Sequence, residues 1–197
     1  MQVVFRVDSA THIGHGHFMR CLTLADGLLA AGCQCRFVCR DFPGSIHGKA
    51  VEHGHQVTTL SSPAAELKQP LPYLQWLGVS PAQDVQDTLQ ALDGLTVNCV
   101  VVDSYSLDAQ WHNTIRAGLD NPSLQLLVID DLANRHYACD WLLDQTLNRP
   151  RSDYEPFSPT KSNRDIVRIY PTKLPIGGRS GRATLPSWDA TSRWEQP

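Results

Sequence analysis

No apolar run in the sequence reaches the length of about 20 residues that a membrane-spanning helix requires. The N-terminus also lacks the basic segment and the long apolar segment of a secretory signal peptide. Positive charge is not in excess, since 17 Lys and Arg stand against 20 Asp and Glu and give a net charge of −3. We therefore expect a cytoplasmic protein without a membrane partner, and the charge argues against a nucleic-acid partner as well.

Several catalytic and metal-binding motifs are missing too. The sequence has no Gly-x-Ser-x-Gly turn of serine hydrolases and no Gly-Lys-Ser/Thr phosphate loop. Six cysteines are present, but the closely spaced Cys33, Cys35 and Cys39 lack the paired spacing of zinc sites. We expect reduced thiols that pack as small apolar side chains, with neither a metal nor a cofactor.

Short apolar runs alternate with helical patterns along much of the chain. Strands are expected at 3–7, 35–39, 56–60, 99–102, 124–129 and 141–143. Helices are expected at 18–31, 45–52, 82–92 and 107–119. Continuous apolar strands separated by helices are typical of a mostly parallel sheet that is covered on both faces. We therefore predict an α/β fold of this kind.

In such a sheet, ligands bind beyond the carboxyl ends of the strands. Polar residues follow three of the expected strands, namely Asp8, then Asp103 with Ser104 and Tyr105, then Asp130 with Asp131. We expect these side chains to share one rim of the sheet.

The loop after the first strand has two glycines and three histidines, and it leads into an expected helix. Gly14 and Gly16 let a ligand approach the backbone closely, and the N-terminus of a helix attracts anions. His17 stands where the helix should begin, and its ring exchanges a proton near neutral pH. The pattern predicts a phosphate-bearing small molecule, with His17 as general base or as the group that positions water. It is equally compatible with a structural His17 that a carboxylate or a backbone group satisfies.

A metal is a second possibility for this loop. His12, His15 and His17, with Asp8 nearby, supply ligand atoms that zinc accepts. Three histidines crowded in one loop do not match a helix-borne motif such as His-Glu-x-x-His. We therefore expect no metal there.

The other rim residues also have two possible roles. Asp103 and Tyr105 suit hydrogen bonds to substrate hydroxyl or amide groups, but they also suit loop bracing. Asp108 is expected to cap the following helix. Asp130 and Asp131 suit orientation of the histidine loop or substrate binding, but paired carboxylates at a strand end are more typical of turn formation.

The chain changes character near Arg149. Residues 149–197 hold seven of the 13 prolines and nine basic against five acidic side chains, and only 166–170 looks like a strand. We therefore expect a Rossmann-like body, residues 1–148, and a basic tail, residues 149–197, that is poorly ordered over much of its length. Such a tail also suits RNA or an acidic partner, but prolines dilute its charges.

Several ordered motifs resemble one enzyme family. Phe5-Arg6-Val7-Asp8, Ile13-Gly14-His15-Gly16-His17 and Arg20-Cys21 resemble the N-terminal signature of UDP-2,4-diacetamido-2,4,6-trideoxy-β-L-altropyranose hydrolase, a UDP-sugar hydrolase of pseudaminic acid biosynthesis. The resemblance continues through 76–79, 101–108, 128–133 and 139–145, and it covers roughly residues 1–157.

The resemblance implies a fold similar to the N-terminal domain of two-domain nucleotide-sugar glycosyltransferases, with a UDP-sugar as the small-molecule partner. It implies that His17 is the active-site histidine and that Tyr105 lies near the substrate. In the implied reaction, water attacks the anomeric carbon and UDP leaves. We predict one catalytic residue, His17, and five substrate-binding residues: Asp8, Gly14, Gly16, Asp103 and Tyr105.

Members of this family continue into a second domain that supplies most of the UDP-binding surface, whereas this chain stops at Pro197. We therefore expect residues 149–197 to be a remnant of that domain or the product of out-of-frame translation, and the chain to be weakly active or inactive. Two alternatives are a non-catalytic sugar-binding remnant and an acyl- or glycosyltransferase, which requires an acceptor.

Overall fold

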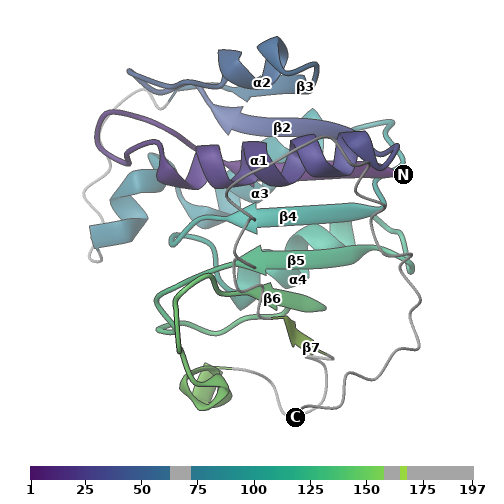
Figure 1. Ribbon diagram of the computed structural model, residues 1–197. Helices are drawn as coiled ribbons and strands as arrows, with labels where there is room; N and C mark the ends of the chain where they lie inside the picture. The colour runs from purple at the N-terminus through teal and green to yellow at the C-terminus, as the bar shows by residue number, and fades with distance from the viewer. Residues whose placement is uncertain (63–71, 158–164, 168–197) are drawn as a thin grey trace, which may run out of the picture.

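The computed structural model describes residues 1–62, 72–157 and 165–167. Within these ranges the chain forms one sheet with the strand order β3-β2-β1-β4-β5-β6-β7, and all neighbouring strands are parallel (Figure 1). The strands are β1 Gln2–Val7, β2 Gln34–Arg40, β3 Gln56–Leu60, β4 Cys99–Asp103, β5 Gln125–Ile129, β6 Trp141–Leu143 and β7 Asp165–Val167. The helices are α1 Gly16–Ala30, α2 Gly48–Glu52, α3 Pro81–Ala91 and α4 Ala109–Gly118, with 3-10 turns η1 Pro72–Leu77 and η2 Arg151–Phe157.

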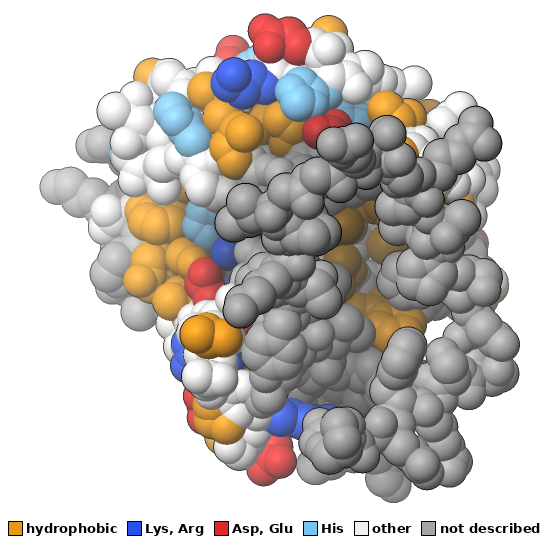
Figure 2. All heavy atoms as spheres, viewed as in Figure 1, with side chains coloured by type: hydrophobic (Ala, Val, Ile, Leu, Met, Phe, Trp, Pro, Cys, Tyr) orange, Lys and Arg blue, Asp and Glu red, His pale blue; other side chains and the backbone are white. Residues whose placement is uncertain are grey.

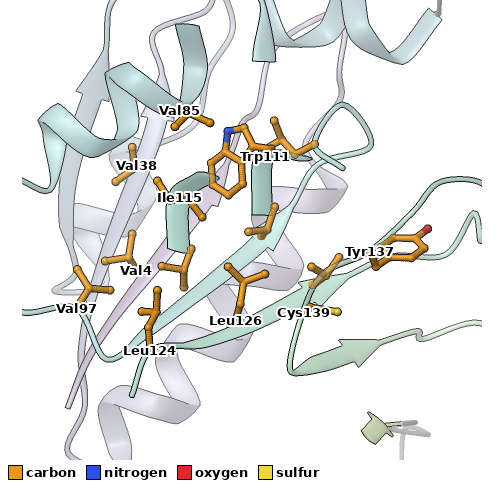
Figure 3. Packing of buried hydrophobic residues seen from close by; sticks show 14 of the residues in the cluster. Val4, Val38, Val85, Val97, Trp111, Ile115, Leu124, Leu126, Tyr137 and Cys139 are labelled. Carbon is orange, nitrogen blue, oxygen red and sulfur yellow. The ribbon is translucent and has the colours of Figure 1, made fainter. Parts of the chain in front are cut away.

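The sheet has an apolar core on each face. On one face, Phe18 and Leu22 of α1 belong to the same buried cluster as Phe5 of β1 and Phe37 of β2. On the other face, side chains of α3 and α4 pack against the alternate residues of the strands, as Figure 3 shows for Val85, Trp111, Ile115, Val4 and Leu126. In Figure 1, α1 lies in front of the sheet and α3 and α4 lie behind it. The predicted α/β fold with helices on both faces is therefore confirmed.

All four helices begin one to three residues away from the expected starts, and the differences at α4 and α1 concern residues near the rim. The expected helix at 107–119 begins at Ala109, because the Asp108 carboxylate accepts a hydrogen bond from the Gln110 N–H at 3.0 Å and caps the helix there. The expected cap role of Asp108 is thus confirmed. The expected helix at 18–31 begins earlier, at Gly16, so that His17 lies within its first turn.

The segment after residue 148 is partly joined to the body. Tyr154 of η2 is 1% exposed and belongs to the core cluster on the α3–α4 face, and its hydroxyl donates to Asp144 Oδ2 at 2.7 Å. Strand β7, Asp165–Val167, pairs with β6 and overlaps the start of the strand expected at 166–170. The α/β unit therefore continues beyond residue 148. The expected disorder at 158–164 and 168–197 concerns residues outside the described ranges.

Within the described ranges, no helix combines the length and the apolar character needed to cross a bilayer. The carboxyl ends of the strands meet at one edge of the sheet, where the arrowheads of β2, β4 and β5 point in Figure 1. The loop from β1 to α1 lies at this edge, as does the loop that follows β4.

Candidate active site

The loop between β1 and α1 is a tight turn that needs glycine. Gly14 has φ of 86°, a left-handed conformation that glycine adopts without steric cost, and its N–H donates to Ala10 O at 2.8 Å. The Thr11 N–H donates to Pro43 O at 3.1 Å and ties this loop to the one after β2. A Cβ added at Gly14 or Gly16 would meet no atom within 4 Å, so the space beside both glycines is open.

His17 pairs with a carboxylate from a different strand. Its Nδ1 lies 2.6 Å from Oδ1 of Asp103, the last residue of β4. The side chain of His17 is 12% exposed and that of Asp103 is 0% exposed. The pairing brings together two residues that the sequence analysis singled out separately, and it fixes the imidazole at the rim of the sheet.

Arg20 lies one turn along α1 from His17 and holds the same carboxylate. Its Nε and Nη2 donate to the two oxygens of Asp103, both at 2.6 Å, and its Nη1 donates to Asp131 at 3.1 Å. Burial alone would lower the pKa of the Arg20 guanidinium, but the hydrogen bonds and negative charges of Asp103 and Asp131 outweigh it and raise the pKa. Arg20 therefore remains a fixed cation that orients Asp103.

These contacts decide which nitrogen of His17 carries the hydrogen. Asp103 accepts hydrogen bonds from Arg20 at both oxygens, so it acts as an acceptor toward Nδ1 as well. Nδ1 therefore donates to Asp103. The nearby Arg20 Nη2, at 3.1 Å from Nδ1, cannot be bonded to it, because both atoms then carry hydrogens. Nε2 has no hydrogen-bond partner among the described residues, and in the neutral ring with its hydrogen on Nδ1 it is the nitrogen that carries the lone pair.

Tyr105 forms a further part of the same network. Its hydroxyl donates to Asp131 Oδ1, and its ring meets the His17 imidazole edge to face, with 4.6 Å between the ring centroids. Burial and the hydrogen bond to Asp131 raise the pKa of the Tyr105 hydroxyl. Burial also raises the pKa of the Asp131 carboxyl, but Tyr105 and Arg20 more than offset this effect and lower it. Tyr105 thus stays a hydrogen-bond donor that braces the wall beside His17.

A hollow lies at this point of the rim. It is partly open to solvent and is lined by Asp8, Ile13, His17, Trp76, Asp103, Ser104 and Tyr105. At the left of Figure 2, where the strands end, histidine, basic and acidic side chains lie beside a group of hydrophobic ones. The hollow therefore has both charged and apolar walls.

Asp8 lines the hollow from the end of β1. Its Oδ1 accepts hydrogen bonds from Arg6 Nη1 at 2.6 Å and from the backbone N–H of Arg40 at 2.7 Å. Asp8 is 5% exposed. Because one of its oxygens is held by both partners, the carboxylate has a fixed direction at the wall.

The adjacent carboxylates after β5 have separate roles. Asp130 is 0% exposed, and its oxygens accept hydrogen bonds from the backbone N–H groups of Leu132 and Ala133 and from the side chains of Arg135 and Tyr137. It therefore braces the turn, as favoured from the sequence. Asp131, in contrast, joins the network around His17 through Arg20 and Tyr105.

Of the six predicted site residues, four line the hollow: Asp8, His17, Asp103 and Tyr105. Gly14 and Gly16 lie in the turn that leads to His17. The sequence analysis assigned no role to Arg20 or Trp76 and favoured a structural one for Asp131. The signal for Arg20 was its spacing of three residues from His17, which places both on one face of a helix.

The other loop histidines face different partners. The His12 ring packs edge to face on Phe42 with 5.1 Å between centroids, and His15 Nε2 lies 3.0 Å from Gly44 O. Within the described part of the chain, no group of three or more His, Cys, Asp or Glu side chains is placed to hold a metal ion.

No protein-family model matches the sequence, and no curated protein does. The structure is similar to that of MurG from Acinetobacter baumannii, with a TM-score of 0.47, 11% sequence identity, and coverage of 75% of this chain and 42% of that chain. This chain thus matches less than half of the length of MurG.

Proposed function

We propose that this chain hydrolyses a UDP-linked 2,4-diacetamido-2,4,6-trideoxy sugar to the free sugar and UDP. The sequence motifs that resemble the hydrolase family support the choice of substrate. The contact between His17 Nδ1 and Asp103 Oδ1 carries the choice of reaction, because it leaves Nε2 as a base at the wall of the hollow.

In this reaction, Nε2 of His17 accepts a proton from water while the water oxygen bonds to the anomeric carbon. The bond between that carbon and the phosphate oxygen breaks, and UDP leaves with the electron pair. Asp103 keeps the imidazole in the Nδ1–H tautomer and stabilises the imidazolium that forms. Arg20 holds Asp103 in place through both carboxylate oxygens.

The first turn of α1 provides a place for the departing diphosphate. The N-terminus of a helix carries unpaired N–H groups and a partial positive charge, which favour phosphate oxygens. The His15 side chain contacts Gly44 O instead of capping this end, and the space beside Gly16 is open. In the family that the motifs resemble, a second domain completes the UDP site.

The test measures UDP release from the UDP-linked sugar without an added acceptor. We expect release by the chain, alone or fused to the UDP-binding domain of a member of that family, and at least a 100-fold loss in His17→Leu. His53→Leu is the matched control, because that ring is exposed and contacts Asp26, away from the hollow. Unchanged turnover in His17→Leu, or release that requires an acceptor, contradicts the proposal.

A further inference from the structure

Three aromatic side chains form a cluster beside His17. Tyr73 and Trp76 of η1 meet edge to face with 5.0 Å between centroids, and the centroid of the Trp76 ring lies 5.8 Å from that of Tyr105. The Trp76 ring also approaches the His17 ring, with 6.3 Å between centroids. Trp76 is half-buried and lines the hollow, which gives the hollow a broad apolar wall next to the proposed base.

The position of Trp76 is fixed from both sides of η1. Leu77, the next residue, is 1% exposed and belongs to the core cluster on the α3–α4 face. The Ser106 hydroxyl donates to Tyr73 O and ties η1 to the loop that follows β4. Gly78 ends the turn with φ of 71°. These contacts anchor η1, and the indole packs beside the rings of Tyr73, Tyr105 and His17.

The walls of the hollow differ in chemistry. Asp8 and Ser104 contribute polar atoms, whereas Ile13 and Trp76 contribute apolar surface. A ligand that fits both walls has hydrogen-bonding groups on one edge and an apolar group on another. A hydroxyl pressed against the apolar wall loses its hydrogen bonds to water without replacement, whereas a methyl group there gains by leaving water.

Building on the proposed function, we propose that Trp76 is a specificity-determining residue that selects sugars with a methyl group at C6 over sugars with a hydroxymethyl group there. The indole face packs on the C6 methyl group, with Ile13 as the second apolar contact. The polar wall then faces the hydroxyl and amide groups of the ring. Trp76 takes no part in bond breaking or proton transfer and affects only the binding of the sugar.

The test uses two free sugars that differ only in the C6 hydroxyl, 2-acetamido-2,6-dideoxyglucose and N-acetylglucosamine. Their dissociation constants are measured by NMR titration of the full chain, following the indole N–H signals. We expect the 6-deoxy sugar to bind about tenfold more tightly. Trp76→Ala should reduce this ratio to about one, and Trp76→Phe should retain an intermediate ratio. Trp141→Ala is the matched control, because Trp141 lies on β6 and its indole donates to Gln125.

Equal affinity for both sugars, binding of neither, or a ratio unchanged in folded Trp76→Ala would overturn this inference. The ratio in the unaltered chain and in Trp76→Phe decides the matter even where Trp76→Ala fails to fold. Discrimination without UDP release would contradict the proposed hydrolysis and leave the role of Trp76 standing. UDP release with equal affinities for the two sugars would support the proposed hydrolysis and contradict the role of Trp76.

Discussion

At the scale of single residues, Asp103 is the centre of the candidate site. It accepts hydrogen bonds from His17 and Arg20, and the Cys21 thiol lies 3.5 Å from its Oδ2. With a side chain that is 0% exposed and two engaged oxygens, it acts on the substrate through His17. Asp103 is therefore a positioning residue in the proposed reaction, and His17 is the group that touches the reacting water.

Asp103→Asn tests this role. The amide keeps the size of the carboxylate but cannot hold the Nδ1–H tautomer or stabilise the imidazolium, so we expect kcat for UDP release to fall by about 10²- to 10⁴-fold. KM should change little, because Asp103 does not hold the sugar. Steady-state kinetics separate the two constants, with Asp93→Asn in an exposed loop as the control. A folded variant with unchanged kcat would show that Asp103 does not position His17.

The roles of some of these residues can be predicted from the sequence, whereas the roles of others depend on contacts between distant parts of the chain. His17 and Gly14 stand in one short segment, where a strand, a glycine turn and a helix start are visible together. Arg20 acquires its role only by contact with Asp103 and Asp131, which are 83 and 111 residues away along the chain. Such contacts depend on the strand order, which the periodic pattern does not encode.

At the scale of elements, the ends of α1 show how glycine is used. At the C-terminus, the Gly32 N–H donates to Leu29 O and the Cys33 N–H donates to Leu28 O, both at 2.9 Å. These bonds satisfy the last carbonyl groups of the helix and require the left-handed φ of 84° at Gly32. The sequence analysis ends the expected helix at residue 31, directly before this glycine, and the structure ends α1 at Ala30.

Alanine substitutions at two glycines, one within α1 and one just beyond its C-terminus, should therefore have opposite effects on stability. Gly27 lies within α1, and a Cβ there would meet nothing within 4 Å, so Gly27→Ala should stabilise the fold by about 0.5–1 kcal/mol. Gly32→Ala should destabilise it by about 1 kcal/mol, because a side chain disfavours the left-handed conformation. Urea unfolding of both variants beside the unaltered chain gives the free energies. A gain in stability from Gly32→Ala would contradict this account of the helix end.

The bounds of a helix or strand can be predicted only where the local sequence pattern determines them. Strands β3 and β6 have the bounds expected from their apolar runs. The turn η1 lies between the strand expected at 56–60 and the helix expected at 82–92, where the sequence analysis predicts no helix or strand. Its position depends on Leu77 entering the core and on Ser106 binding Tyr73 O, and both are tertiary contacts.

At the scale of the whole molecule, the core holds ionisable groups that couple stability to pH. His112 of α4 is 0% exposed, and its Nδ1 accepts a hydrogen bond from the Ala138 N–H at 3.3 Å. Burial, with smaller effects of the positive charges of Arg135 and Arg116, lowers the pKa of the His112 ring to about 3. The ring is therefore neutral in the folded chain.

The difference between the pKa of His112 in the folded chain and its pKa in the unfolded chain makes the free energy of unfolding depend on pH. Between the ordinary pKa of histidine, about 6.5, and the folded value of about 3, the unfolded chain binds a proton at His112 that the folded chain does not. Stability from this residue is complete above pH 6.5 and falls as the pH drops toward 3. His112→Gln should reduce the slope of unfolding free energy against pH by about 1.4 kcal/mol per unit in that range.

Urea unfolding between pH 7 and 4.5 measures this slope. His136→Gln is the control, because His136 is exposed and lies outside the core. An unchanged slope in His112→Gln would show that the ring is already charged in the folded chain.

The parallel sheet with helices on both faces was predictable from the sequence, but the residue at which the folded body ends was not. Continuous apolar strands such as 99–102 identified a parallel sheet covered on both faces, and the structure confirms this arrangement. The boundary expected at residue 148 came from proline content and charge. Tyr154 nevertheless enters the core and bonds Asp144, which composition cannot reveal because a single buried side chain is enough to join the segment to the body.

The most direct test of the proposed reaction is the fate of the water oxygen. Hydrolysis of the UDP-linked sugar is carried out in water enriched in oxygen-18, and both products are analysed by mass spectrometry. If His17 directs water to the anomeric carbon, the first turnover places the label on the anomeric hydroxyl of the free sugar and none in UDP. Label in the phosphate of UDP would mean that water attacks phosphorus, and it would contradict the role of His17 derived from its contact with Asp103.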